Sequence, residues 1–219
     1  MNSIFRYPLS DLPYVIISLL IAFTVHEFAH AYVAYKFGDS TAKDQGRLTL
    51  NPIEHIDPIG TLFILIAGFG WARPVPVNRY NFKRPRLAGV LVSVAGPVSN
   101  LLVTIIAFTI MYGMAALNVW NDMPFFVSDL LNVIISMNTM LFVFNLLPIP
   151  PLDGYRIIED LVSPRIRAKM TQYEQYGMLL FLILLVTPLD NYTIQPIFNT
   201  VMPSIIYGLQ DIFTAIFLH

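Results

Sequence analysis

Five consecutive residues carry the clearest sign of chemistry in this sequence, His26-Glu27-Phe28-Ala29-His30. Residues four apart lie on one face of an α-helix, so the two imidazoles can point at one metal ion. Glu27 would then lie beside them, where it can take a proton from a metal-bound water. The spacing therefore predicts a hydrolytic metal centre on a helix.

The residues around this motif are apolar, which indicates where the chemistry takes place. Residues 13–37 form an apolar stretch of about 25 residues, long enough to cross a hydrocarbon core of roughly 30 Å. Before Lys36, its only strongly polar residues belong to the motif. Ionisable side chains at membrane depth cost roughly 2.5–3.5 kcal/mol each on insertion scales, so three within five positions indicate a function. A polar cluster that only binds a neighbouring helix is the alternative.

The composition indicates a membrane protein. Of the 219 residues, 56% are hydrophobic and only 12% are charged, about half the charged share of a soluble domain. The mean hydropathy of +0.63 agrees. The absence of cysteine excludes disulfides and thiolate metal sites, and a net charge of −1 gives no reason to expect a nucleic-acid partner. The expected surroundings are a lipid bilayer, with several passes through a cell membrane.

The apolar segments predict an all-α polytopic membrane protein with one domain over residues 1–219. A stretch at 59–70 is only 12 residues long, too short to span, so we expect it to re-enter the membrane or lie at its interface. Residues 191–203 are polar and turn-rich. About five transmembrane helices are expected, at residues 13–37, 87–117, 130–147, 177–189 and 204–218.

Two basic segments predict the orientation in the membrane. Residues 73–86 contain five basic residues and no acidic one, and residues 155–176 also carry several arginines, so both are expected on the cytoplasmic side. If 59–70 re-enters, the N-terminus lies outside, and Asp153 reaches the same side as the C-terminal half of the first helix. If 59–70 spans, the N-terminus lies inside and the basic segments remain cytoplasmic. We expect the active site towards the cytoplasmic side.

A catalytic zinc ion needs a third protein ligand and one open position. Asp153 is the only acid that directly follows a predicted span within a proline-rich turn, although it could also be an ordinary interfacial residue beside Gly154. We interpret His55 as an interfacial histidine without a metal role. The candidates from residue type alone are Asp153, His55, Asp57, Glu54 and Asp44.

Three motifs together resemble those of the site-2 protease family, peptidase family M50, whose members are polytopic intramembrane zinc metalloproteases. They occur in the family's order and cover residues 26–154: His26-Glu27-Phe28-Ala29-His30, Ala95-Gly96-Pro97-Val98-Ser99-Asn100, and Asn145-Leu146-Leu147-Pro148 with Leu152-Asp153-Gly154. The resemblance implies one Zn²⁺ per chain, held by His26, His30 and Asp153, with Glu27 as general base. It implies that Asn145 positions substrate or stabilises the developing oxyanion.

A fourth element, Gly68-Phe69-Gly70, is similar to the family's Gly-x-Gly element. The resemblance implies a short re-entrant β-like loop after the first helix, in which Gly68, Phe69 and Gly70 bind substrate as an added strand. A simple turn before Trp71 is the alternative. Asn100 could line the site and contact substrate, or it could bond across helices.

The function implied is that of an intramembrane zinc endopeptidase. Its substrates would be transmembrane proteins cleaved in or near their spans, in regulated intramembrane proteolysis or in clearance of signal-peptide remnants. The chain resembles the family's short form, with no room for a PDZ domain or a CBS-type domain. Two alternatives remain. A metal-handling protein or transporter would show polar positions on several helices. A catalytically silent scaffold would have lost Glu27 or a ligand.

Overall fold

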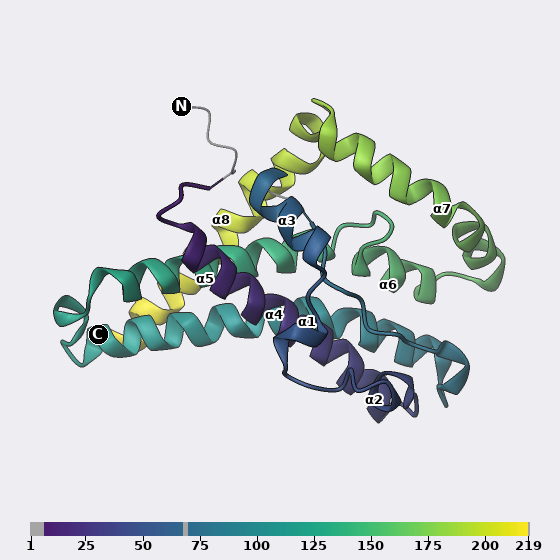
Figure 1. Cartoon of the computed structure of the whole chain (residues 1–219), viewed down its shortest axis with the longest axis horizontal. Helices are drawn as coiled ribbons and strands as arrows, with labels where there is room; N and C mark the ends of the chain where they lie inside the picture. Colours follow the sequence, from purple (N-terminus) through teal and green to yellow (C-terminus); the bar gives the residue numbers. More distant parts are fainter. Residues whose placement is uncertain (1–6, 68–69, 219) are drawn as a thin grey trace.

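The computed structural model describes residues 7–67 and 70–218, and the regular secondary structure of this part consists of helices joined by loops (Figure 1). This part contains no strand, which confirms the all-α prediction. Three short 3₁₀ helices are Pro52–Glu54 (η1), Arg79–Asn81 (η2) and Trp120–Asp122 (η3). The α-helices are α1 Leu12–Lys36, α2 Thr41–Asp44, α3 Pro58–Ala67, α4 Pro85–Ala116, α5 Phe125–Asn145, α6 Asp153–Leu161, α7 Pro164–Val186 and α8 Asp190–Phe217.

Within the described residues, four helices are long and apolar enough to cross a membrane: α1, α4, α5 and α8. This confirms the polytopic fold, but with four candidate spans where about five were expected. Helix α7 is not one of them because its first half carries Arg165, Arg167 and Lys169. Its remaining apolar residues, 177–186, would reach only about 15 Å at the rise of an α-helix, half the hydrocarbon thickness.

The last helix is longer than predicted. Residues 191–203 were expected to form a turn-rich segment, and this was wrong, because α8 runs continuously from Asp190 to Phe217 with Pro196 and Pro203 inside it. Proline is tolerated within membrane helices because the local backbone readjusts around the missing hydrogen bond. A proline is therefore weaker evidence for a helix end in this chain than in a soluble protein.

The segment after the first helix is too short to span, as predicted, but its described part is not β-like. Pro58–Ala67 forms α3, which begins where Asp57 Oδ1 accepts the N–H groups of Ile59 and Gly60, both at 2.9 Å. An aspartate before a proline is a strong helix start, and an apolar run then forms its hydrogen bonds internally. Of the expected substrate loop, Gly68 and Phe69 lie outside the described residues.

Helices α1, α4 and α5 pack against one another and form the core that carries the site (Figure 1). On α1, Val15, Leu19 and Phe23 are buried against Met137 and Leu141 of α5. Helix α6 lies against α4. The first residue of α6 thus reaches the second half of α1.

Candidate active site

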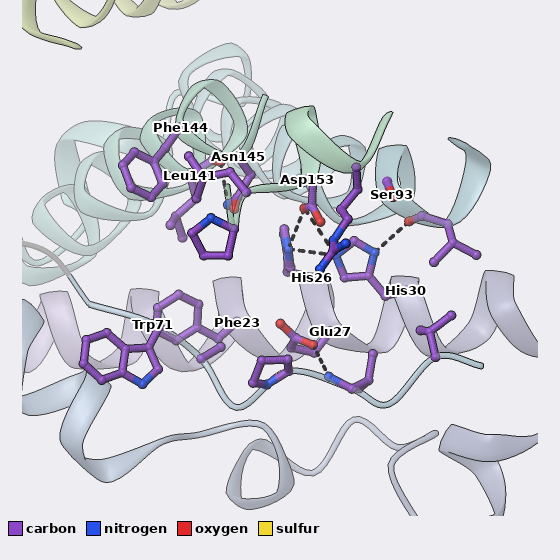
Figure 2. A pocket seen from close by; sticks show the side chains of 18 of the residues that line it. Phe23, His26, Glu27, His30, Trp71, Ser93, Leu141, Phe144, Asn145 and Asp153 are labelled. Carbon is purple, nitrogen blue, oxygen red and sulfur yellow. Dashed lines mark hydrogen bonds and ion pairs between the residues drawn. The ribbon is translucent and has the colours of Figure 1, made fainter. Parts of the chain in front are cut away.

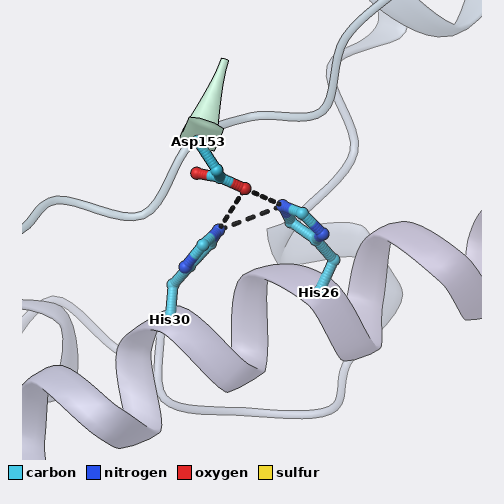
Figure 3. Close-up of side chains that lie close together, drawn as sticks. All are labelled: His26, His30 and Asp153. Carbon is cyan, nitrogen blue, oxygen red and sulfur yellow. Dashed lines mark hydrogen bonds and ion pairs between the residues drawn. The ribbon is translucent and has the colours of Figure 1, made fainter. Parts of the chain in front are cut away.

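His26 and His30 of α1 meet the carboxylate of Asp153 from the start of α6 (Figure 3). The Nε2 atoms of His26 and His30 are 3.0 Å apart. Asp153 Oδ2 lies 3.2 Å from the first and 3.3 Å from the second. No other group of three metal-ligating side chains converges in this way among the described residues. The candidates His55, Asp57, Glu54 and Asp44 are not part of the cluster.

These three atoms fit a tetrahedral metal ion. Zinc is held at about 2.0–2.2 Å by imidazole and carboxylate, so two ligand atoms of a tetrahedron lie about 3.3–3.5 Å apart. The three observed separations are close to this value. Asp153 Oδ2 is buried and has no hydrogen-bond donor in the described part of the chain, apart from the facing imidazoles. The three atoms could thus hold a zinc ion and leave one position for water or substrate.

Glu27 lies beside His26 and His30 at the same cavity (Figure 2). It is buried on α1. Its Oε2 accepts a hydrogen bond from the main-chain N–H of Val75 at 2.8 Å. The second carboxylate oxygen is not used in that contact.

Both histidines are oriented through their second ring nitrogen. His26 Nδ1 lies 2.8 Å from Asn100 Oδ1, and His30 Nδ1 lies 2.7 Å from the carbonyl oxygen of Val92. Oxygens of this kind only accept hydrogen bonds, so each Nδ1 carries the proton. The lone pair of each Nε2 is then free for a metal ion.

Asn100 lies behind His26 and not in the cavity, which corrects the expectation that it contacts substrate. It is fully buried, and its Nδ2 donates to the carbonyl oxygen of Ala22 at 3.2 Å and to Asn138 Oδ1 at 3.1 Å. Since a carbonyl can only accept, the amide must turn its oxygen towards His26. The alternative of bonding across helices is the one observed.

Gly96 of the second motif allows α4 to approach the ligands. A Cβ atom at this position would lie only 2.6 Å from His26 Cε1 and 2.5 Å from His30 Cε1. Real Cβ contacts are longer, so a side chain here would displace the imidazoles or the helix.

The cavity around the ligands has a volume of about 550 Å³. Asn145, at the end of α5, and Gly70 both line it. Asn145 Nδ2 donates to the carbonyl oxygen of Leu141 at 3.0 Å, which leaves its second N–H for another acceptor. The wall also includes aromatic side chains and two arginines, among them Phe23, Trp71, Phe144, Arg79 and Arg156.

The arginines belong to an ion-pair network that anchors α6. Arg79 Nη1 lies 2.6 Å from Asp160 Oδ1, and Arg156 Nη1 lies 3.2 Å from Glu159 Oε2. Burial raises the pKa of the Asp160 carboxyl above its ordinary value, although Arg79 and Arg167 oppose this. No sequence pattern indicates this network, because Arg79 and Asp160 lie far apart in the chain.

His55 is buried within the protein rather than exposed at an interface. Its side chain is fully inaccessible, and Nε2 lies 2.8 Å from the carbonyl oxygen of Thr49. It is absent from the cavity wall and from the metal cluster.

The fold and the site together define a polytopic membrane protein with a metallopeptidase-type centre. Comparison with known proteins supports the same class of protein. The sequence model of peptidase family M50 matches residues 113–187, which include Asn145 and Asp153. A Bacillus subtilis (strain 168) protein named "Putative zinc metalloprotease YwhC" is 57% identical over 99% of this chain and 98% of its own length.

More distant relatives point to the same family. Proteins named "Putative zinc metalloprotease Rip2" from Mycolicibacterium smegmatis and Mycobacterium tuberculosis (strain H37Rv) are each 30% identical over 81% of this chain and 68% of their own length. No solved structure matches the sequence. The chain belongs to peptidase family M50, the site-2 protease family that its motifs predicted.

Proposed function

We propose that this protein is a zinc-dependent intramembrane endopeptidase with one Zn²⁺ per chain. The observation that carries the proposal is the convergence of His26 Nε2, His30 Nε2 and Asp153 Oδ2 beside Glu27, on helices able to span a membrane. The names of the relatives, which describe zinc metalloproteases, support the choice of metal.

The chemistry is peptide-bond hydrolysis. Zinc, when bound, lowers the pKa of a coordinated water to roughly 7 and polarises the substrate carbonyl. Glu27 accepts a proton from the attacking water as its oxygen bonds to the carbonyl carbon. It then returns a proton to the amine nitrogen as the C–N bond breaks. Asn145 has an amide N–H at the cavity wall that can stabilise the developing oxyanion.

The substrates we propose are segments of transmembrane proteins. A membrane helix is resistant to cleavage because its backbone bonds are satisfied internally, so a substrate must unwind before its carbonyl reaches the ligands. An unwound segment can be held by main-chain bonds as an added strand. Gly70 at the cavity wall supports such a role for the Gly68-Phe69-Gly70 element. Regulated proteolysis and signal-peptide-remnant clearance both use substrates of this kind.

We place the protein in a cell membrane with the active site towards the cytoplasmic side. The positive-inside rule supports this orientation, since the basic segment at 73–86 and the first half of α7 flank the elements that form the site.

The test combines zinc content with cleavage of a generic single-span substrate by purified protein. Wild-type protein is expected to hold one zinc ion and to cleave. Glu27→Gln should keep zinc and lose at least about 100-fold in kcat, the usual contribution of a general base. Asp153→Ala should lose both zinc and cleavage. Undiminished cleavage by Glu27→Gln would refute the base assignment, and a zinc content near zero in wild-type protein would favour a silent scaffold.

A further inference from the structure

The segment 71–78, which follows α3 and contains no helix, passes α1 at Glu27 (Figure 2). Its centre is Pro74-Val75-Pro76. Proline has no N–H, so Val75 is the only main-chain donor among these three residues, and that donor bonds to Glu27 Oε2. A residue before proline favours an extended backbone, which applies to both Arg73 and Val75. The sequence thus produces a stiff segment with a single donor at its centre.

One end of this segment is held by two buried residues that do not line the cavity. Arg47, only 5% exposed, donates from Nη2 to the carbonyl oxygen of Arg73 at 2.7 Å. The N–H of Arg73 donates to the main-chain carbonyl of His55 at 2.9 Å. The buried imidazole of His55 is itself held by Thr49. Both main-chain groups of Arg73 are therefore engaged directly before Pro74.

The other end is held by Asp39, which is fully buried just after α1. Its Oδ2 accepts the N–H of Asn78 at 2.7 Å, and its Oδ1 accepts Asn81 Nδ2 at 2.8 Å. Burial alone would raise the pKa of Asp39, but hydrogen bonds from Thr41, Asn81 and Asn78 outweigh it and lower the pKa below its ordinary value. The anchor is thus a carboxylate that accepts the N–H of Asn78, the last residue of the 71–78 segment, and is itself held by Thr41 and Asn81.

We propose that Asp39, Arg47 and His55 are positioning residues that hold the Val75 N–H against Glu27. Because the Val75 N–H holds Oε2 of Glu27, the Glu27 carboxylate keeps one orientation. Its other oxygen, Oε1, remains free to accept the proton of the attacking water. The proposal rests on the proposed function, because it takes Glu27 as the general base. It assigns a role to the three buried polar residues between α1 and α3, none of which lines the cavity.

The first experiment removes the N–H without removing the segment. Val75→Pro deletes the donor, whereas the matched variant Val75→Ala keeps it and loses the same side chain. A hydrogen bond to a charged group contributes about 1.5–3 kcal/mol, so kcat of Val75→Pro should be roughly 10- to 100-fold below that of Val75→Ala, with equal zinc content. Equal kcat values for the two variants would overturn the proposal.

The second experiment tests whether the anchors act through that bond. Arg47→Met and Asp39→Asn should each lower kcat about 10-fold, the equivalent of one hydrogen bond, with zinc content unchanged. Arg47→Lys, which keeps a donor, should recover part of the loss. In the Val75→Pro background neither anchor substitution should lower kcat further. If an anchor substitution lowers kcat by the same factor in the Val75→Pro background as in the wild-type background, the anchors have a general structural role and the proposal is overturned.

The two hypotheses fail differently. If Glu27→Gln cleaves normally, the assignment of the base is wrong. If Glu27→Gln is inactive but Val75→Pro matches Val75→Ala, the base stands and only the positioning role is wrong. Should Arg47→Met not fold, Arg47→Lys and Asp39→Asn in both backgrounds carry the same comparison.

Discussion

Asn100 Oδ1 of α4 lies 2.8 Å from His26 Nδ1 of α1, and this contact determines which nitrogen of the imidazole faces the metal site. The carbonyl of Ala22 and the side chain of Asn138 hold the Asn100 amide in the required direction. Asn100 and Asn138, which are both buried, therefore orient His26 without lining the cavity.

Asn100→Leu should weaken zinc binding. Removing the partner of a metal-ligating histidine typically costs 10- to 100-fold in metal affinity, because the ring loses its fixed orientation. Competition between the purified protein and a chelator measures the affinity. Asn132→Leu, an exposed position on α5, is the matched control and should bind zinc as wild type does. Equal affinity for both variants would contradict the role given to Asn100.

Gly96→Ala should impair both stability and zinc binding. The added methyl group would lie within 2.6 Å of both imidazoles, and forcing atoms into a packed site costs about 1–3 kcal/mol. Thermal unfolding in detergent and zinc content measure the effect. Gly208→Ala on α8 is the control, since nothing lies within 4 Å of its added atom, and it should not lower the unfolding temperature. The close approach at Gly96 is refuted if the two variants behave alike.

Arg79→Met should destabilise the protein because it removes the partner at 2.6 Å from Asp160. Breaking a fully buried pair costs roughly 3–5 kcal/mol. The loss here should be smaller, since Arg167 remains 3.3 Å from the same oxygen. Arg79→Met with Asp160→Asn should recover part of the stability, as the uncompensated charge is gone. The exposed Arg84→Met is the control, and a double variant less stable than Arg79→Met would argue against the ion pair.

Asp39 should contribute stability that disappears in acid. Its folded-state pKa lies below the ordinary value of about 4, so the ionised form favours folding above that pH. The contribution is lost as the pH falls through the folded-state pKa. Unfolding measured between about pH 6 and pH 2 should therefore show a shallower loss for Asp39→Asn than for wild type. If stability falls equally steeply with pH in wild type and in Asp39→Asn, the Asp39 carboxylate does not contribute this pH-dependent stability.

The sequence by itself was enough to predict that His26 and His30 share one face of α1, with Glu27 beside them. The spacing of His26, Glu27 and His30 is a property of one helix, and helix geometry is the same wherever the helix lies. The apolar residues around the motif predicted that this helix spans a membrane. That prediction is also local, because it depends only on the length and composition of residues 13–37. Asp153 followed from the family motif, since residue type alone left several acids as candidates.

Tertiary structure decided everything that depends on contact between segments. Asn100 was expected at the substrate and lies behind His26, because its neighbours are set by the packing of α4 on α1. The Val75 N–H on Glu27 has no side-chain signature at all. The uninterrupted α8 also differs from the expectation. Spacing within a helix is fixed by local backbone geometry, whereas distances between helices follow only from how their side chains pack.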